Sequence, residues 1–408
     1  MSWSAPIWIA RRLYYADKQQ DRTSRPAVRV ALIGIFIGVL VMTVTLCVVV
    51  GFKQTITDKI AGFGAHLQVV NFDNNNTYEM LPVSFSDTIM EAIRTTDGVQ
   101  SVTPFITKPG IAKTDSDFIG VVFKSVGDSA FLKSNLREGH LPHTPVQILL
   151  SDRQAAALSL GVGDKVLSYF VEDEVRVRKF EVAGVYSTGF AEYDELFVWC
   201  SEEVLRQLNG WSANEVSGIQ IALDDIYRID EVADGLYDLV ANRFDKDGNG
   251  YYIQTIRELN PAIFSWLDLL NMNVIVIIIL MLAVSGFSIV AGLVILILDG
   301  IQLIGTLKAL GADNRFVRRI FLTQAAMIIL RGMFWGNIAG LGLCAVQYFT
   351  HLLPLDATNY YVNFVPVAFP WLWLVANNVL FLAVSLAVLL LPAAIVSRIE
   401  PSKVMQFE

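Results

Sequence analysis

The 408-residue sequence has little charge and few cysteines, and each shortage excludes a class of protein. Charged residues make up 17% of the chain, below the ~25% of soluble domains, and hydrophobic residues make up 54%. The net charge of −8 excludes a general nucleic-acid binder, which would need a basic face. Three cysteines are too few for a disulfide framework. Because Cys47 and Cys344 lie in apolar runs, we expect only Cys200 to meet water.

The sequence also lacks a motif that would predict catalysis or metal binding. No G-x-x-x-x-G-K-[ST] occurs, so the chain alone is not expected to bind and hydrolyse ATP. Residues 245–250, DKDGNG, copy the first half of a calcium loop, but Ile256 stands where Glu is needed, which favours a turn. His140 and His143 lack a third ligand, and the acidic residues in 192–194 lack a nucleophile or histidine. We predict no catalytic residue, no metal site and no cofactor bound by this chain.

Long uncharged runs are the main feature of the sequence. A helix that crosses a bilayer needs about 20 apolar residues, and four stretches meet this length. The first run is too long for a signal peptide and no small-residue cleavage site follows it. The predicted transmembrane helices are residues 28–50, 272–298, 320–349 and 369–396.

The distribution of positive charge predicts the orientation of these helices. Lys and Arg are frequent before the first helix, between the second and third, and after the fourth, whereas residues 350–368 contain none. Both termini are therefore expected in the cytoplasm and residues 51–271 outside. The expected cytoplasmic parts are an amphipathic segment at 1–27, a loop at 299–319 and a tail at 397–408. Residues 51–271 hold 18 basic and 32 acidic residues, so the outer part is acidic.

Residues 51–271 are expected to form a mixed α/β domain. Caps and apolar periodicity predict helices, and alternation predicts strands, in the order strand, helix, β-rich block, strand, helix, strand. This order indicates one α/β unit with a β-rich insertion at about 107–216. The predicted fold class is an α-helical membrane protein with four transmembrane helices plus an extracytoplasmic α/β domain that carries the insertion. The helices are expected at 86–94, 151–160 and 231–244, and the strands at 99–105, 165–171, 175–186, 196–199 and 251–256.

Small residues and one charge distinguish the transmembrane segments. Gly34 and Gly38 in the first, and Gly332 and Gly336 in the third, are four residues apart and share a helical face. Such spacing lets helix backbones approach closely. Arg331 is expected near mid-bilayer, where an unpaired cation costs ~2.5–3.5 kcal/mol. It should therefore face protein or water, or else snorkel or bond to carbonyls.

The loop at 299–319 differs from an ordinary linker. Apolar residues recur every third position before Gly311, which predicts a short amphipathic helix that ends there. An apolar face at the cytoplasmic surface must rest on the membrane or on another protein. The apolar positions are Ile301, Ile304, Leu307 and Leu310.

Several segments, in order and over most of the chain, carry a family resemblance. They are IARR at 9–12, ITDKIAGFGAHLQV at 56–69, ILLSDRQAAALSLGVGDKV at 148–166, AGVYSTGFAEYDELFV at 183–198, LNPAIFSWLDLLNMN at 259–273, LIGTLKALGADNRFVRRIFLTQAAMI at 303–328 and IEPSKVMQFE at 399–408. Together with the layout of one helix, a large outer domain and three helices, they resemble the FtsX-like permeases of ABC transporters. Within that family they are most similar to the lipoprotein-releasing (LolC/LolE-type) permeases.

The resemblance implies a permease that pairs with a second copy or a paralogue. It also implies a separate ABC ATPase dimer that binds the permease and carries ATP and Mg²⁺. The outer domain would be the family's porter unit. A lipoprotein would be taken from the outer leaflet of a Gram-negative inner membrane and delivered to a periplasmic carrier. Residues 299–319 would be the coupling helix, although related chains often have Glu in place of Asp299. The residues that would contact the ATPase are Asp299, Ile304, Leu307, Lys308, Leu310 and Gly311.

A lipoprotein's acyl chains would need an apolar wall at the outer ends of the first two transmembrane helices. The alternative interpretation is that these side chains pack the bundle or face lipid. The residues expected to form the wall are Val44, Val48, Ile263, Phe264, Leu267 and Met272.

Three other functions remain open from the sequence. An FtsX-type division regulator shares the four helices but usually has a much smaller outer domain. A MacB-type efflux permease shares the outer α/β organisation but normally has an ATPase fused before the first helix. A passive anchor or receptor would not need the amphipathic loop at 299–319.

Overall fold

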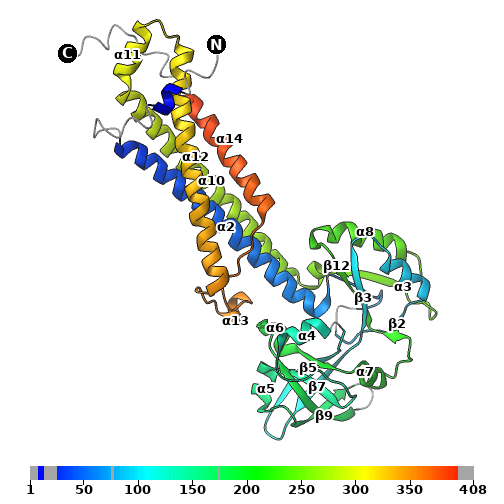
Figure 1. Cartoon of the computed structure of the whole chain (residues 1–408). Helices are drawn as coiled ribbons and strands as arrows, with labels where there is room; N and C mark the ends of the chain where they lie inside the picture. The colour runs from blue at the N-terminus through cyan, green and yellow to red at the C-terminus, as the bar shows by residue number, and fades with distance from the viewer. Residues whose placement is uncertain (1–7, 13–24, 75–77, 128, 172–174, 394–408) are drawn as a thin grey trace. The chain divides into compact units, whose positions relative to one another are not determined.

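The computed structural model describes residues 8–12, 25–74, 78–127, 129–171 and 175–393 (Figure 1). The chain divides into two compact units. The membrane unit comprises residues 1–53, 267–353 and 365–408, and the α/β unit comprises residues 54–266 and 354–364. The predicted tail at 397–408 and most of the segment at 1–27 lie outside the described residues.

Four helices are long and apolar enough to cross a membrane, which confirms the predicted number of spans. With 40 and 39 residues, α2 and α10 are each about 60 Å long at ~1.5 Å per residue. This is twice the ~30 Å of a bilayer's hydrocarbon core, so both helices continue well beyond it. The four helices are α2 (Arg25–Gly64), α10 (Pro261–Asp299), α12 (Asn314–Thr350) and α14 (Trp371–Ala393); α11 (Ile301–Ala309) separates α10 from α12.

Glycine brings α2 close to α10. A Cβ atom on Gly34 would clash with Ser288, and one on Gly38 would clash with Ser285. Ser285 also donates a hydrogen bond to the Gly34 carbonyl, at 3.4 Å. The predicted small face of the first span therefore lies against the second span.

A second glycine face brings α12 close to another side of α2. A Cβ atom on Gly332 would lie 2.6 Å from the Ile35 side chain, and one on Gly336 would lie 2.9 Å from the Phe36 carbonyl oxygen. Lipid tails are as apolar as leucine, so close packing of this kind, rather than hydrophobic burial, stabilises helix contacts in a bilayer.

The α/β unit contains a four-stranded antiparallel sheet in the order β13-β1-β12-β3. Helices α3 and α8 contact each other and this sheet (Figure 1). Ser86 accepts a hydrogen bond from Ile89 N and so caps α3, as its position in the sequence predicts. The elements are β1 (Leu67–Asn71), α3 (Asp87–Arg94), β3 (Val99–Phe105), β12 (Gly218–Leu223), α8 (Ile229–Val240) and β13 (Tyr251–Thr255).

Between β3 and β12 the chain forms a second sheet of seven strands in the order β6-β9-β7-β10-β5-β4-β8, and β8 also pairs with β9. This extra pairing closes the sheet around a core in which the rings of Phe123, Phe170 and Phe180 contact one another. The strands are β4 (Thr107–Lys113), β5 (Phe118–Ser125), β6 (Leu136–Gly139), β7 (Gln147–Ser151), β8 (Lys165–Val171), β9 (Val175–Tyr186) and β10 (Phe197–Cys200).

Short elements complete the unit. The acidic segment at 192–194 lies in a helix, α6, and its buried Asp194 carboxylate accepts hydrogen bonds from Thr188 and Gly189 N. The short elements are β2 (Val83–Ser84), α4 (Ser129–Asn135), α5 (Asp152–Leu158), α6 (Ala191–Leu196), α7 (Glu202–Asn209), β11 (Glu215–Val216), η1 (Ile226–Arg228), α9 (Ile256–Leu259) and α13 (Ala357–Tyr360).

The prediction that Cys200 meets water is wrong. Its side chain is 0% exposed, since β10 is paired on both sides, with β5 and with β7. Burial also raises the pKa of the Cys200 thiol above its ordinary value, so the reactive thiolate is disfavoured. Cys47 and Cys344 are buried as well.

We predict that a bulky maleimide will leave the folded, purified protein unlabelled, because all three cysteines are buried. Ser116→Cys, at an exposed position, should add one rapidly labelled site. Labelling is read by intact-protein mass spectrometry before and after unfolding. Fast modification of Cys200 in the folded protein would contradict the burial of β10.

We also predict that Gly336→Ala will lower the thermal unfolding temperature of the purified protein. Its Cβ would press on the α2 backbone, and overpacking costs ~1–3 kcal/mol. Gly342→Ala on the same helix is the matched control, because nothing lies within 4 Å of the added atom. Equal unfolding temperatures for the two variants would show that α2 and α12 are not in close contact.

Candidate functional site

The loop predicted to couple the protein to a partner contains a defined helix, α11. Gly311 stops it with a backbone φ of +89°, a conformation that glycine adopts without strain. Gly311 N bonds to the Lys308 carbonyl at 2.9 Å and Ala312 N bonds to the Leu307 carbonyl at 2.9 Å. These two bonds form a Schellman motif, which satisfies carbonyls at the end of the helix.

The apolar positions of α11 do not share one face. Residues three apart are 300° apart around a helix, so each step shifts the side chain by about 60°, and Ile301 and Leu310 differ by about half a turn. Ile304 is accordingly buried in the bundle core with Val317 and Phe321, and Leu307 packs against the same core. Leu310, by contrast, is 81% exposed. The prediction that these four residues form one continuous apolar stripe is therefore wrong.

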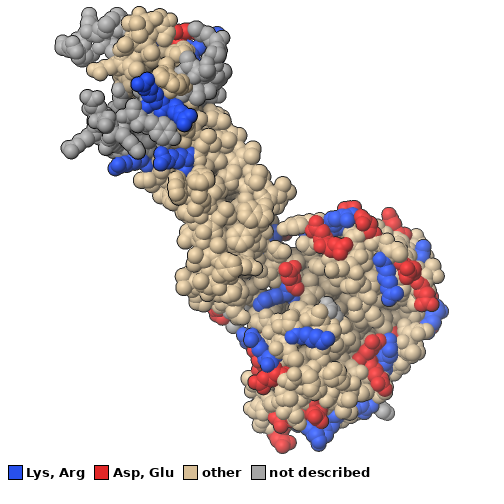
Figure 2. All heavy atoms as spheres, in the orientation of Figure 1, with Lys and Arg blue, Asp and Glu red and all other residues tan. Residues whose placement is uncertain are grey.

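An exposed face of α11 remains at one end of the bundle. Besides Leu310, it contains Gln302, Thr306 and Ala309. Figure 1 shows α11 at the end of the bundle where α14 ends. On the face seen in Figure 2, the Lys and Arg residues of the membrane unit gather at this end, and the middle of the bundle shows none. Asp299 ends α10, and Lys308 and Gly311 lie on either side of Leu310.

Inside the bundle, a cluster of polar side chains that the sequence analysis missed connects three helices. Thr43 of α2 donates a hydrogen bond to Asn337 Oδ1 of α12 at 3.2 Å. Asn337 and Asn378 of α14 exchange two further hydrogen bonds, of 2.7 and 3.1 Å. Asparagines in two otherwise apolar segments, α12 and α14, were the available signal, because amides in a bilayer need partners.

Arg331 lies at an exposed position of α12, next to the buried glycine face. Within this chain its side chain is thus not buried in the bundle. The exposed neighbours on the helix are the apolar Leu330, Phe334 and Trp335.

The residues predicted to line a path for acyl chains differ in their exposure. Ile263 and Leu267 are buried, and Val44, Val48 and Phe264 are half-buried. Met272 alone among the six is exposed, at 60%. Ile263 and Leu267 therefore do not present a surface to a ligand in this conformation.

Met272 belongs to a long uncovered surface of α10. Only 11% of the most apolar 18 residues of α10 are buried, against 39% for the corresponding windows of α2 and α12. We call this surface the α10 face; it comprises Leu269, Met272, Ile275, Val276, Ile279, Leu280, Val284 and Phe287.

The polar motifs of the α/β unit have structural roles. Asp245 accepts hydrogen bonds from Asp247 N and Asn249 N at 2.9 and 2.8 Å, which makes the segment at 245–250 a turn. The rings of His140 and His143 stack with centroids 5.3 Å apart. No group of three or more potential metal ligands occurs in the described part of the chain.

Four apolar helices, an α/β unit inserted between the first and second, and the α11 turn between the second and third define a multi-pass membrane protein of the permease class. Residues 30–239 match the family described as the MacB-like periplasmic core domain, and residues 275–401 match the FtsX-like permease C-terminal family. The chain belongs to the FtsX-like permeases that carry a MacB-like core domain.

Two relatives match this chain over nearly its whole length. It is 23% identical to the lipoprotein-releasing system transmembrane protein LolC of Xylella fastidiosa, with 93% of each chain covered. It is 19% identical to the lipoprotein-releasing system transmembrane protein LolE of Haemophilus influenzae, over 98% of this chain and 99% of that one. The periplasmic region of MacB from Actinobacillus actinomycetemcomitans is 16% identical over 50% of this chain, with a TM-score of 0.33.

Proposed function

We propose that this chain is the permease subunit of an ABC transporter that removes lipoproteins from the outer leaflet of a Gram-negative inner membrane. The observation that carries the proposal is the similarity to LolC and LolE over nearly the full length of both chains. A passive anchor is disfavoured, because an anchor would not need α11, a helix that lies between two membrane helices and ends at Gly311. An FtsX-type or MacB-type role is the less supported alternative.

The energetics of the substrate explain why such a task needs ATP. Each methylene of an acyl chain contributes ~0.8 kcal/mol to membrane binding, so a protein held by more than one chain does not leave spontaneously. The permease itself has no P-loop. ATP and Mg²⁺ would be bound by a separate ATPase dimer, and two permease chains, identical or paralogous, would share it. The released lipoprotein would pass to a periplasmic carrier.

The proposed orientation has both termini and α11 in the cytoplasm and the α/β unit in the periplasm. The gathering of Lys and Arg at the α11 end of the bundle supports it (Figure 2). The exposed face of α11, with Leu310 at its end, would then dock on the ATPase. The α10 face would meet the second permease chain or the acyl chains of the substrate.

Depleting this protein in its native host tests the function. The expected result is that lipoproteins destined for the outer membrane stay in the inner membrane, measured by membrane fractionation. Filamentous cells with normally sorted lipoproteins would favour the division role, and drug sensitivity with normal sorting would favour efflux.

We predict that Leu310→Asp will weaken co-purification of the ATPase by about tenfold or more, which corresponds to ~1.4 kcal/mol. A carboxylate at an exposed position leaves the fold intact but is unfavourable in an apolar contact. Leu307→Asp is a poorer test, because Leu307 packs against the chain's own core. Leu352→Asp is the matched control, since Leu352 is also exposed but follows the other end of α12. Unchanged recovery of the ATPase with Leu310→Asp would place this residue outside the contact.

A photo-crosslinking residue at Met272 should trap a lipoprotein through its acylated end. ATP added before irradiation should lower the trapped fraction. The control position is Leu372 of α14, which is equally apolar and 80% exposed but lies outside the α10 face. Equal trapping at both positions would indicate general contact with lipid and would remove the α10 face from the substrate path.

A further inference from the structure

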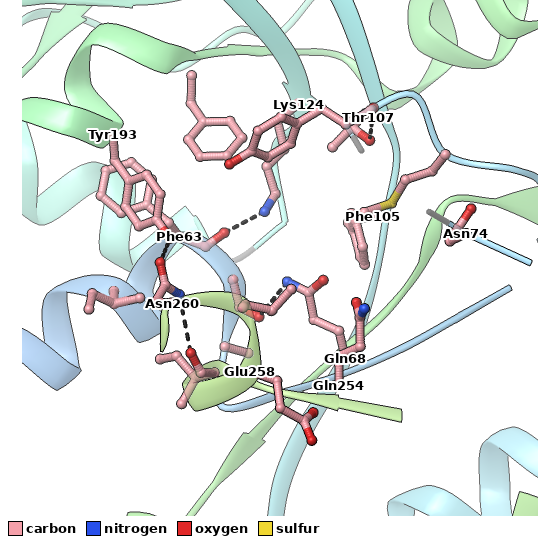
Figure 3. A pocket seen from close by; sticks show the side chains of 18 of the residues that line it. Phe63, Gln68, Asn74, Phe105, Thr107, Lys124, Tyr193, Gln254, Glu258 and Asn260 are labelled. Atoms are coloured by element: carbon pink, nitrogen blue, oxygen red, sulfur yellow. Dashed lines mark hydrogen bonds between the residues drawn. The ribbon is translucent and has the colours of Figure 1, made fainter. Parts of the chain in front are cut away.

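A pocket of about 330 Å³ lies in the α/β unit where the two sheets meet (Figure 3). The four-stranded sheet contributes Gln68 and Phe105, the seven-stranded sheet contributes Lys124 and Phe197, and α2 contributes Phe63. The volume falls at the lower end of the ~300–1,000 Å³ typical of small-molecule sites. None of the six residues predicted to line a path for acyl chains lines this pocket.

Lys124 is the unusual residue of this pocket. It is only 4% exposed, yet no carboxylate pairs with it in the described part of the chain. Its Nζ donates one hydrogen bond, to the Phe63 carbonyl, as Figure 3 shows. A buried ammonium normally has an anionic partner or a full set of acceptors, because burial of an unpaired charge is costly.

Aromatic rings surround the Lys124 ammonium. Its Nζ lies 5.1, 5.3 and 5.7 Å from the ring centroids of Phe105, Phe197 and Trp199. Ring faces attract a cation but do not neutralise it. Burial lowers the pKa of Lys124 from its ordinary value to about 7. A bound anion would stabilise the protonated form of the side chain.

The remaining wall of the pocket is mostly apolar. Ile60, Met80 and Leu259 line it, and the rings of Tyr78 and Tyr193 extend the aromatic surface. One polar atom on the wall, Asn74 Nδ2, is buried without an acceptor among the described residues. The described wall of the pocket thus provides an apolar and aromatic surface, one cation, and one amide N–H group without an acceptor.

We propose that this pocket binds a small amphiphile that consists of a single carboxylate and an apolar, aromatic body. The carboxylate would accept hydrogen bonds from Lys124 Nζ, and the body would pack among Phe63, Tyr193 and Phe197. A phosphate dianion fits less well, because the pocket supplies one cation rather than several. The proposal concerns a second site and does not depend on lipoprotein release.

The test compares two nearly isosteric probes, the anionic 4-phenylbutanoate and the neutral 4-phenylbutanamide. Each is titrated calorimetrically into the full-length protein in nanodiscs at pH 6.5, with empty nanodiscs as the blank for partition into lipid. The carboxylate should bind about 10- to 100-fold more tightly than the amide, as expected for a charge-assisted hydrogen bond. Equal affinities, or no binding of either probe, would overturn the proposal.

Two further measurements assign the preference to Lys124. The variant Lys124→Met keeps the apolar stem and should bind both probes equally. In the wild type, raising the pH from 6.5 to 8.5 should weaken binding of the carboxylate, because Lys124 loses its proton above about pH 7 while the ligand stays ionised. Binding of the amide should not change. The other titratable groups on the wall are Tyr78 and Tyr193, whose pKa values are raised by burial so that both stay neutral, and Glu258.

The pH and probe comparisons use the wild-type protein, so they test the proposed carboxylate site even if the Lys124→Met variant folds poorly. A carboxylate preference that persists in Lys124→Met, or that does not fall with pH, would show that another group binds the anion.

Discussion

The close contacts of α2 with two other helices are the constraint on which the membrane unit depends. One face of α2 meets α10 through Gly34 and Gly38, and another meets the glycine face of α12. Neither contact leaves room for a larger side chain. In a bilayer, where burial of apolar surface gives no net advantage, such backbone proximity and a few hydrogen bonds determine which helices pair. The bond from Thr43 to Asn337, and from there to Asn378, extends the same connection to α14.

Much of the fold follows from local sequence patterns. Strands β3, β8 and β9 have the predicted bounds, because alternation and β-branched residues define a strand without reference to its neighbours. The helix capped by Ser86 and the stop at Gly311 are also local, since a cap needs only residues within one turn. The four membrane helices follow from length and hydrophobicity alone.

The features that could not be predicted all depend on contacts between distant segments. A short strand such as β10 does not reveal that it is central in a sheet, so the burial of Cys200 was missed. A spacing of three resembles an apolar stripe, but on a helix it turns about 60° at each step and separates Ile304 from Leu310. The pocket around Lys124 combines β3, β5, β10 and the end of α2, which are up to about 130 residues apart in the sequence. No single segment carries its signal.

Helix α10 shows how far a hydrophobic pattern can define a function. Its sequence is apolar on all sides, so periodicity gives no preferred face, and only the packed structure distinguishes the side that meets α2 from the α10 face. If such a helix served only as an anchor, either its own bundle or lipid could cover its surface. In a permease that handles acylated proteins, however, an uncovered apolar surface is required, because the acyl chains must exchange lipid contacts for protein contacts of similar free energy. Under the proposed function, the tight packing of α2 and the uncovered surface of α10 are therefore complementary. Helix α2 is fixed within the bundle, and α10 keeps a surface that can contact a second chain and the substrate.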